Sequence, residues 1–156
     1  MQRGNDENPA DPAWVRLCAA GELDPGQRLA ARRTILANAL ALDATLYRSA
    51  EDDPEAEEEE LGDARILLTG PFRAPAGWNP VEHAEYFAGN DPELFFSAFI
   101  ECAAASSSAG FFVADVGDYV AAVAADGQVQ MYFVHDWQED EQGRLCVLLR
   151  DDQSLF

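Results

Sequence analysis

The alternation of apolar and polar residues between Gly110 and Arg150 constrains the fold more than any other feature. Two dipeptides, Gly117-Asp118 and Asp126-Gly127, tolerate the positive φ of tight turns and therefore predict two-residue hairpin loops. Alternation resumes from Arg144 to Arg150 and predicts a further strand. The stretch 110–150 is therefore expected to form an antiparallel meander of four short strands.

The register of these two hairpins divides the side chains between two faces of the expected sheet. With two-residue loops, Val120 pairs with Phe133 and Ala122 pairs with Met131. The expected core face collects Phe111, Val113, Val120, Ala122, Ala124, Val129, Met131 and Phe133. The opposite face mixes alanines with glutamines and aromatic residues, including Phe112, Tyr119 and Tyr132. A helix of this chain or a partner protein is expected to cover this mixed face.

Helix-start signals recur before and between the expected strands. In Asp11-Pro12, Asp24-Pro25, Asn79-Pro80 and Asp91-Pro92, a capping side chain precedes a proline that fits the first helical turn. Helices are expected over 12–20, 25–48, 80–88 and 92–108, and a short strand is expected over 65–69. The last helix is apolar on nearly every side in its first half, so it should pack on the sheet. The predicted fold class is α+β, with N-terminal and central helices packed on a mainly antiparallel β-meander of about residues 110–150.

Length and composition favour a single domain over residues 1–156. A chain of 156 residues that is 48% hydrophobic can bury a substantial core. We expect a disordered N-terminus over 1–10 and a solvated acidic linker over 51–63, where adjacent carboxylates repel one another. No apolar run reaches the length of a membrane span, and the N-terminus lacks a secretory apolar core, so a cytoplasmic location is expected. Cys18, Cys102 and Cys146 are widely spaced and odd in number, which predicts reduced core thiols.

The charge is strongly negative and unevenly distributed. The net charge is -19, and all ten basic residues are arginine. Residues 1–50 hold six acids and six arginines, whereas residues 51–156 hold 23 acids and four arginines. Salt adaptation should spread acids over the whole surface, so this local excess favours a basic protein partner and opposes direct nucleic-acid binding. Arg28, Arg32 and Arg33 predict a solvated helix face; the alternatives are that they bind an anion or dock an acidic segment.

No motif indicates catalysis, and we expect no enzymatic activity, no metal site and no cofactor. Cys102, His135 and Asp136 follow the order of some cysteine hydrolases, but Cys102 falls within an expected helix, far from a thiolate-stabilising N-terminus. His83 and His135 have no spacing that would require them to converge on a metal.

The segment from His135 to Gly143 is the expected binding loop, because it is the one long interruption in the meander. Its candidate contact residues are Asp136, Trp137, Glu139, Asp140 and Glu141, joined by the steering carboxylates Glu57, Glu58, Glu59 and Glu60. Trp137 either anchors a partner or folds back to cap the sheet edge, and both interpretations remain open.

These features favour an acidic binding or inhibitor protein that neutralises a basic partner. An immunity protein of a bacterial toxin–immunity (secreted effector) system fits the size, charge and expected location, as a monomer or homodimer. The first alternative is a cytoplasmic chaperone for a secreted effector, which would use the mixed sheet face. The second is a small enzyme with a site near the 135–143 loop.

Overall fold

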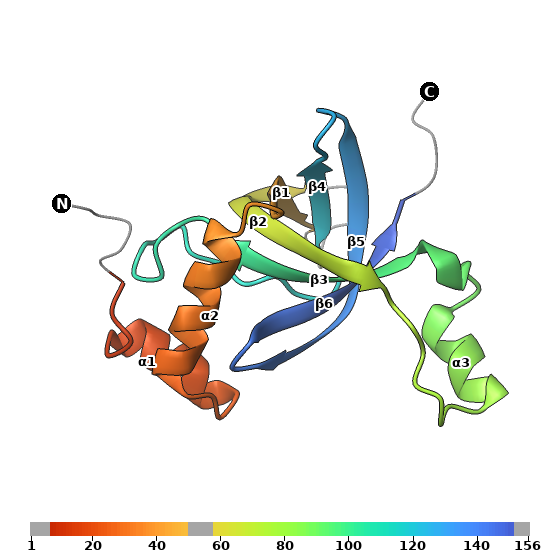
Figure 1. Cartoon of the computed structure of the whole chain (residues 1–156), viewed down its shortest axis with the longest axis horizontal. Coiled ribbons are helices and arrows are strands. Elements are labelled where there is room, and N and C mark those ends of the chain that lie inside the picture. Colours follow the sequence, from red (N-terminus) through yellow and green to blue (C-terminus); the bar gives the residue numbers. More distant parts are fainter. Residues whose placement is uncertain (1–6, 50–57, 152–156) are drawn as a thin grey trace.

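The computed structural model describes residues 7–49 and 58–151. Six antiparallel strands close into a barrel in the order β1-β2-β3-β6-β5-β4. The strands are β1 (Leu42–Arg48), β2 (Glu59–Pro71), β3 (Phe95–Cys102), β4 (Tyr119–Val123), β5 (Val129–Asp140) and β6 (Gly143–Arg150). Helices α1 (Pro12–Ala20) and α2 (Pro25–Ala37) lie on one side of the barrel, and α3 (Pro80–Phe87) lies on the other (Figure 1). The predicted fold of helices packed on an open meander is therefore wrong, because the sheet closes on itself.

The barrel interior is the main hydrophobic core. Alternate residues of each strand point inward, which gives a filled interior in a barrel of this size. The buried residues of this core are Ala44, Leu46, Ala64, Ile66, Ala98, Ile100, Ala114, Val120, Ala122, Tyr132, Val134, Cys146 and Leu148. The prediction of buried thiols is confirmed, since Cys18, Cys102 and Cys146 are all free and buried.

Three of the four predicted helix starts begin α-helices as expected. Asp11 accepts a hydrogen bond from the Ala13 amide, and Asp24 accepts one from the Gln27 amide. Asn79 forms a capping box with Glu82 at the start of α3. Helices α1 and α3 match their predicted ranges within one residue. Among the described residues, no helix is long and apolar enough to span a membrane.

The predicted helix over 25–48 is wrong in its second half. Helix α2 ends at Ala37, and the Asn38 side chain accepts a hydrogen bond from the Leu40 amide in the following turn. Strand β1 then places Ala44 and Leu46 inside the barrel. The spacing of leucines along this segment is compatible with a helical stripe, but its buried residues follow the two-residue period of a strand.

The predicted buried helix over 92–108 is also wrong. A short 3-10 turn, η1 (Pro92–Leu94), leads into β3, which lies between β2 and β6. Near its end, β3 is covered on both faces, and Ile100, Glu101 and Cys102 are all buried. A strand buried on both faces is apolar without alternation, and this pattern resembles that of a buried helix.

The predicted hairpin register between β4 and β5 is wrong by one residue. Val123 pairs with Val129, and the turn contains Gly127 at a φ of 85°, so the loop is longer than two residues. On β5, Tyr132 therefore points into the core and Phe133 points outward, the reverse of the expected faces. The first predicted strand, which precedes Gly117, does not form: residues 111–116 are irregular. Strand β1 pairs with β4 in its place.

The ends of the predicted linker and tail are ordered where the structure describes them. Residues 59–63 of the expected linker belong to β2, while residues 51–57 lie outside the described residues. In the expected N-terminal tail, the Glu7 carboxylate accepts hydrogen bonds from Arg32 and from the Ser106 amide. Residues 1–6 lie outside the described residues.

Candidate interaction surface

Most of the described arginines bind carboxylates of the same chain, and three of them, Arg28, Arg32 and Arg144, are buried. Five of those that the structure describes form ion pairs with carboxylates: Arg28, Arg32, Arg48, Arg65 and Arg144. Arg28 and Arg32 are 4% and 1% exposed, so the prediction of a solvated helix face is wrong for both; Arg33 is exposed. Most of the positive charge in the described residues therefore forms ion pairs within the chain.

A buried ion-pair network, made of Glu7, Arg28, Arg32, Glu101, Glu139 and Arg144, joins α2 to the barrel. Arg28 lies 2.6 Å from Glu101 and 2.8 Å from Glu139. Burial opposes the charge of Arg28, but Glu101 and Glu139 outweigh it and raise the pKa of the guanidinium. Glu139, which the sequence placed on a binding loop, is thus an internal structural residue.

The acids, by contrast, remain at the surface. The exposed acids in the described residues are Glu22, Asp24, Asp43, Glu58, Glu59, Glu60, Asp63, Glu82, Glu85, Asp91, Glu93, Asp115, Asp126, Asp136, Asp140 and Asp151. Only Arg16, Arg33 and Arg73 are exposed arginines in the same residues. The described surface therefore carries most of the negative charge of the chain without matching positive charge.

The predicted binding loop over 135–143 is mostly strand. Strand β5 continues to Asp140, which pairs with Gly143, so the turn contains only Glu141 and Gln142. Glu141 accepts a hydrogen bond from the Asp24 amide at the start of α2. The sequence could not locate this hairpin, because the acidic residues from Asp136 to Asp140 have low strand propensity.

Trp137 is packed against the barrel and is also part of a hollow in the surface. The Arg144 guanidinium lies 3.7 Å from the centroid of its ring, and its indole N–H donates to Asp115 at 3.0 Å. The ring contacts the core cluster while remaining half-buried. This position is compatible with both sequence interpretations, because the ring packs against the sheet and also lines a hollow.

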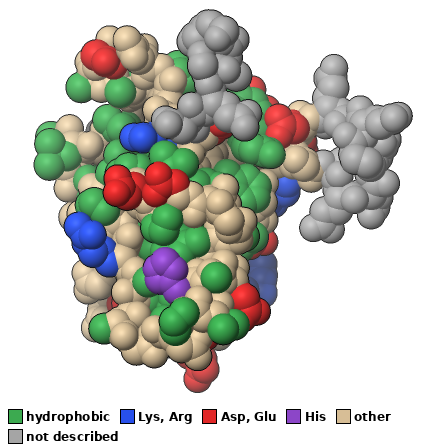
Figure 2. Space-filling model, turned by 90° about the vertical axis from the view of Figure 1, so that its right-hand side faces the viewer, with side chains coloured by type: hydrophobic (Ala, Val, Ile, Leu, Met, Phe, Trp, Pro, Cys, Tyr) green, Lys and Arg blue, Asp and Glu red, His purple; other side chains and the backbone are tan. Residues whose placement is uncertain are grey.

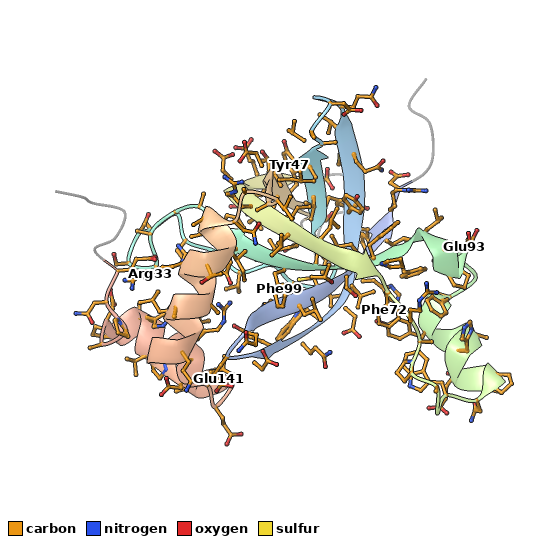
Figure 3. All side chains as sticks on the ribbon, viewed as in Figure 1. Arg33, Tyr47, Phe72, Glu93, Phe99 and Glu141 are labelled. Atoms are coloured by element: carbon orange, nitrogen blue, oxygen red, sulfur yellow. The ribbon has the colours of Figure 1, made fainter. Side chains whose placement is uncertain are left out.

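The predicted contact residues do not form one surface. Asp136 faces α3 and accepts a hydrogen bond from the Tyr86 hydroxyl at 3.0 Å. Glu139 and Glu141 face α2 instead, and Figure 3 shows Glu141 near that helix. Asp140 is exposed next to the turn. Glu58, Glu59 and Glu60 are exposed at the start of β2, and Glu57 lies outside the described residues.

An aromatic cluster holds α3 to the barrel; it contains Phe72, Trp78, His83, Tyr86, Phe87, Phe95 and His135. Phe72 lies between the barrel and α3 (Figure 3) and stacks on Tyr86 with ring centroids 5.4 Å apart. The His135 ring is hydrogen-bonded through Nε2 to the Tyr86 carbonyl at 2.7 Å. On this side of the molecule, hydrophobic side chains surround a histidine, with both acidic and basic side chains around them (Figure 2).

Two hollows flank the loop between β2 and α3. The Trp78 hollow, of about 220 Å³, is lined chiefly by Phe72, Trp78, Tyr86, Asp136 and Trp137. A more open depression of about 740 Å³ lies on the other side of this loop and includes Arg73, His83 and Glu93. The concentration of aromatic residues from Phe72 to Phe87 is the sequence signal that could have identified this region.

The remaining cysteines and histidines lie at separate places in the part of the chain that the structure describes. No group of three or more histidine, cysteine or acidic residues there could hold a metal ion. Cys102 lies on β3, and the Cys146 thiol has its pKa raised to about 12 by burial. His83 and His135 contact the rings of Phe87 and Tyr86, respectively.

Both hollows combine aromatic rings with an exposed carboxylate, but only the larger depression also includes an arginine, Arg73. Comparison of the chain with protein-family models, with curated proteins and with solved structures found no match.

Proposed function

We propose that this chain is an acidic binding protein that neutralises a basic protein partner, in the manner of an immunity protein that blocks a bacterial toxin. The observation that carries this proposal is the division of charge between interior and surface. Buried arginines pair with internal carboxylates, while the exposed acids lack matching exposed arginines. Such a surface attracts a basic protein and speeds its encounter with the chain.

The test is to sequence the neighbouring genes and to co-express this chain with a basic protein that one of them encodes. We expect restored growth if that protein is toxic and a stable complex in size-exclusion chromatography. The Glu58→Gln, Glu59→Gln, Glu60→Gln triple variant should associate several-fold more slowly and with a weaker salt dependence. A variant with the same charge loss at scattered sites, Glu22→Gln, Glu85→Gln and Asp126→Asn, is the matched control. Unchanged association in both variants would contradict electrostatic steering.

A chaperone for a secreted effector is the second candidate, and apolar residues on the outer face of the barrel favour it. Val123 and Val129 are exposed, and Tyr119 and Phe133 line a hollow of about 490 Å³. The other aromatic residues of the expected mixed face are not available, since Tyr132 is buried and Phe112 packs against the core. A chaperone would tolerate the loss of the acids but would lose client binding in the Val129→Thr variant.

A further inference from the structure

The Trp78 hollow has the shape and chemistry of a receptor for a planar cation. Phe72, Trp78 and Tyr86 line the hollow on the α3 side, and Asp136 and Trp137 line it on β5. The remaining lining residues are Pro75, Ser97 on β3, Gln138 on β5, and Leu145 and Val147 on β6. Aromatic faces attract cations through their quadrupole, and a carboxylate adds a charged acceptor. Strands β3, β6 and β5 are neighbours in the sheet, and the segment from Phe72 to Tyr86 lies against them at the hollow.

The walls of the hollow are held in place without a ligand. Trp78 and Tyr86 have ring centroids 4.9 Å apart, and Phe72 stacks on the same tyrosine. On the opposite wall, Trp137 is fixed by the Arg144 guanidinium and by its hydrogen bond to Asp115. Because these rings are already ordered, binding costs little additional conformational entropy.

Asp136 is the charged group of the hollow, and no described arginine forms an ion pair with it. One of its oxygens accepts from the Tyr86 hydroxyl, and the other accepts from the Trp137 amide. Burial and the adjacent Asp136 both raise the pKa of Tyr86, so its hydroxyl remains a donor at neutral pH. A carboxylate offers about four acceptor positions, so Asp136 keeps capacity for a further donor.

We infer that the Trp78 hollow receives an arginine side chain of the basic partner. This inference rests on the proposed function and adds the chemistry of one contact to it. A guanidinium group is flat, weakly hydrated and able to stack on aromatic rings while donating to a carboxylate. The net charge of -19 favours the approach of such a cation to the protein.

The test is an NMR titration of the full chain with the peptide acetyl-Gly-Arg-Gly-amide. The indole N–H signals of Trp78 and Trp137 should shift saturably, while that of Trp14 should not, since Trp14 is 1% exposed and bonded to the Pro25 carbonyl. The same peptide with citrulline in place of arginine keeps the shape and loses the charge. It should produce no saturable shift.

Two variants that lose the same charge decide whether Asp136 is the acceptor. Asp136→Asn keeps an oxygen for the Tyr86 hydroxyl but should weaken arginine-peptide binding about fivefold or more. Asp140→Asn removes an exposed charge from the same strand outside the hollow and should bind as the wild type does. A third variant, Trp78→Leu, should abolish the saturable shift of Trp137.

Three results would overturn the inference: equal shifts with the citrulline peptide, equal weakening by the two aspartate variants, or shifts that avoid both tryptophans. Because the peptide assay needs no partner protein, its failure can be distinguished from failure of the proposed function. A partner that binds Asp136→Asn as tightly as the wild type would leave the acidic binding function intact and exclude the hollow as the contact.

Discussion

The two sides of the barrel hold their helices by opposite means (Figure 1). Helix α2 is joined to the barrel by the buried ion-pair network, in which Arg28, Arg32 and Glu101 are each less than 5% exposed. Helix α3 is joined to it by rings, with Phe87 packed on Phe95 at a centroid distance of 4.8 Å. One side therefore uses buried charge, and the other side uses aromatic contacts that extend from the buried Phe87 and Phe95 to the half-buried Trp78 and Tyr86.

This difference separates structural residues from residues available for binding. A buried ion pair costs a large desolvation energy and is retained only when every charge keeps its partner. The residues of the buried ion-pair network are therefore not available to bind another protein. Aromatic contacts tolerate partial exposure, so the rings of Trp78 and Trp137 can support the fold and still present a face to a ligand.

The largest expected effect comes from breaking the ion-pair network at its centre. Glu101→Gln keeps the size of the side chain but leaves Arg28 and Arg32 without a shared counter-charge. We expect a loss of about 3–5 kcal/mol in the free energy of unfolding, measured by urea denaturation. The control is Asp43→Asn, which breaks the exposed ion pair with Arg65 and should cost less than about 1 kcal/mol. Similar losses in both variants would mean that the network behaves as a solvated surface cluster.

A smaller effect is expected on the other side of the barrel from Trp137→Ala. Removing this half-buried ring deprives Arg144 of its aromatic cover and should lower the free energy of unfolding by about 2 kcal/mol. Binding of the arginine peptide should also be lost, because the ring lines the hollow.

Trp78→Ala is the control for this second prediction. It removes another ring of the hollow, one that is absent from the main core cluster. It should abolish peptide binding with a smaller loss of stability than Trp137→Ala. Thermal melting and peptide titration on both variants provide the comparison. A Trp137→Ala protein that melts like the wild type would show that the ring supports only binding.

Local chemistry predicted the helix starts of this protein well. Asp11, Asp24 and Asn79 act as N-caps, and the proline after each begins an α-helix. Such signals involve only neighbouring residues, so they mark where a helical turn starts but not how far it continues. Asp91-Pro92 starts only the 3-10 turn η1. The strand over 65–69 was also predicted correctly, from a short local run of apolar residues, and it forms part of the longer β2.

Features that depend on closure of the sheet could not be predicted. Residues 42–48 become a strand because β2 and β4 both offer partners, which a helical stripe of leucines does not indicate. The face of Tyr132 depends on one extra residue in the loop at Gly127, and a one-residue shift reverses every side chain of a strand. Glu101 and Arg28 are 73 positions apart in the sequence, and no pattern links them.

The candidate site illustrates the same limit. Asp136 and Trp137 were identified because an aromatic ring among acids is typical of binding surfaces. Their partners Trp78 and Tyr86 were not, since only the folded barrel brings α3 against β5. Glu139 was assigned to the same surface, although it lies on the strand face toward α2.

The smallest expected effect is a pH-dependent loss of stability from the ion pair between Glu7 and Arg32, on the α2 side of the barrel. The Glu7 carboxylate accepts hydrogen bonds from Arg32 at 3.0 Å and from the Ser106 amide at 2.7 Å. Burial raises the pKa of Glu7, but Arg32 and Ser106 outweigh it and lower the pKa below the ordinary value of 4.5. A carboxylate whose pKa is lowered by folding stabilises the folded state above its unfolded pKa, and this contribution disappears as the pH falls through the folded pKa.

Glu7→Gln should therefore be less stable than the wild type by about 1–2 kcal/mol at pH 7. This difference should stay constant down to about pH 5 and then shrink as the wild-type carboxylate becomes protonated. Urea denaturation of both proteins between pH 7 and pH 3 measures it. All other acids are common to the two proteins, so their titration largely cancels in the difference. A difference that grows as the pH falls would mean that burial outweighs Arg32, and the N-terminal segment would then be held to α2 by contacts other than this ion pair.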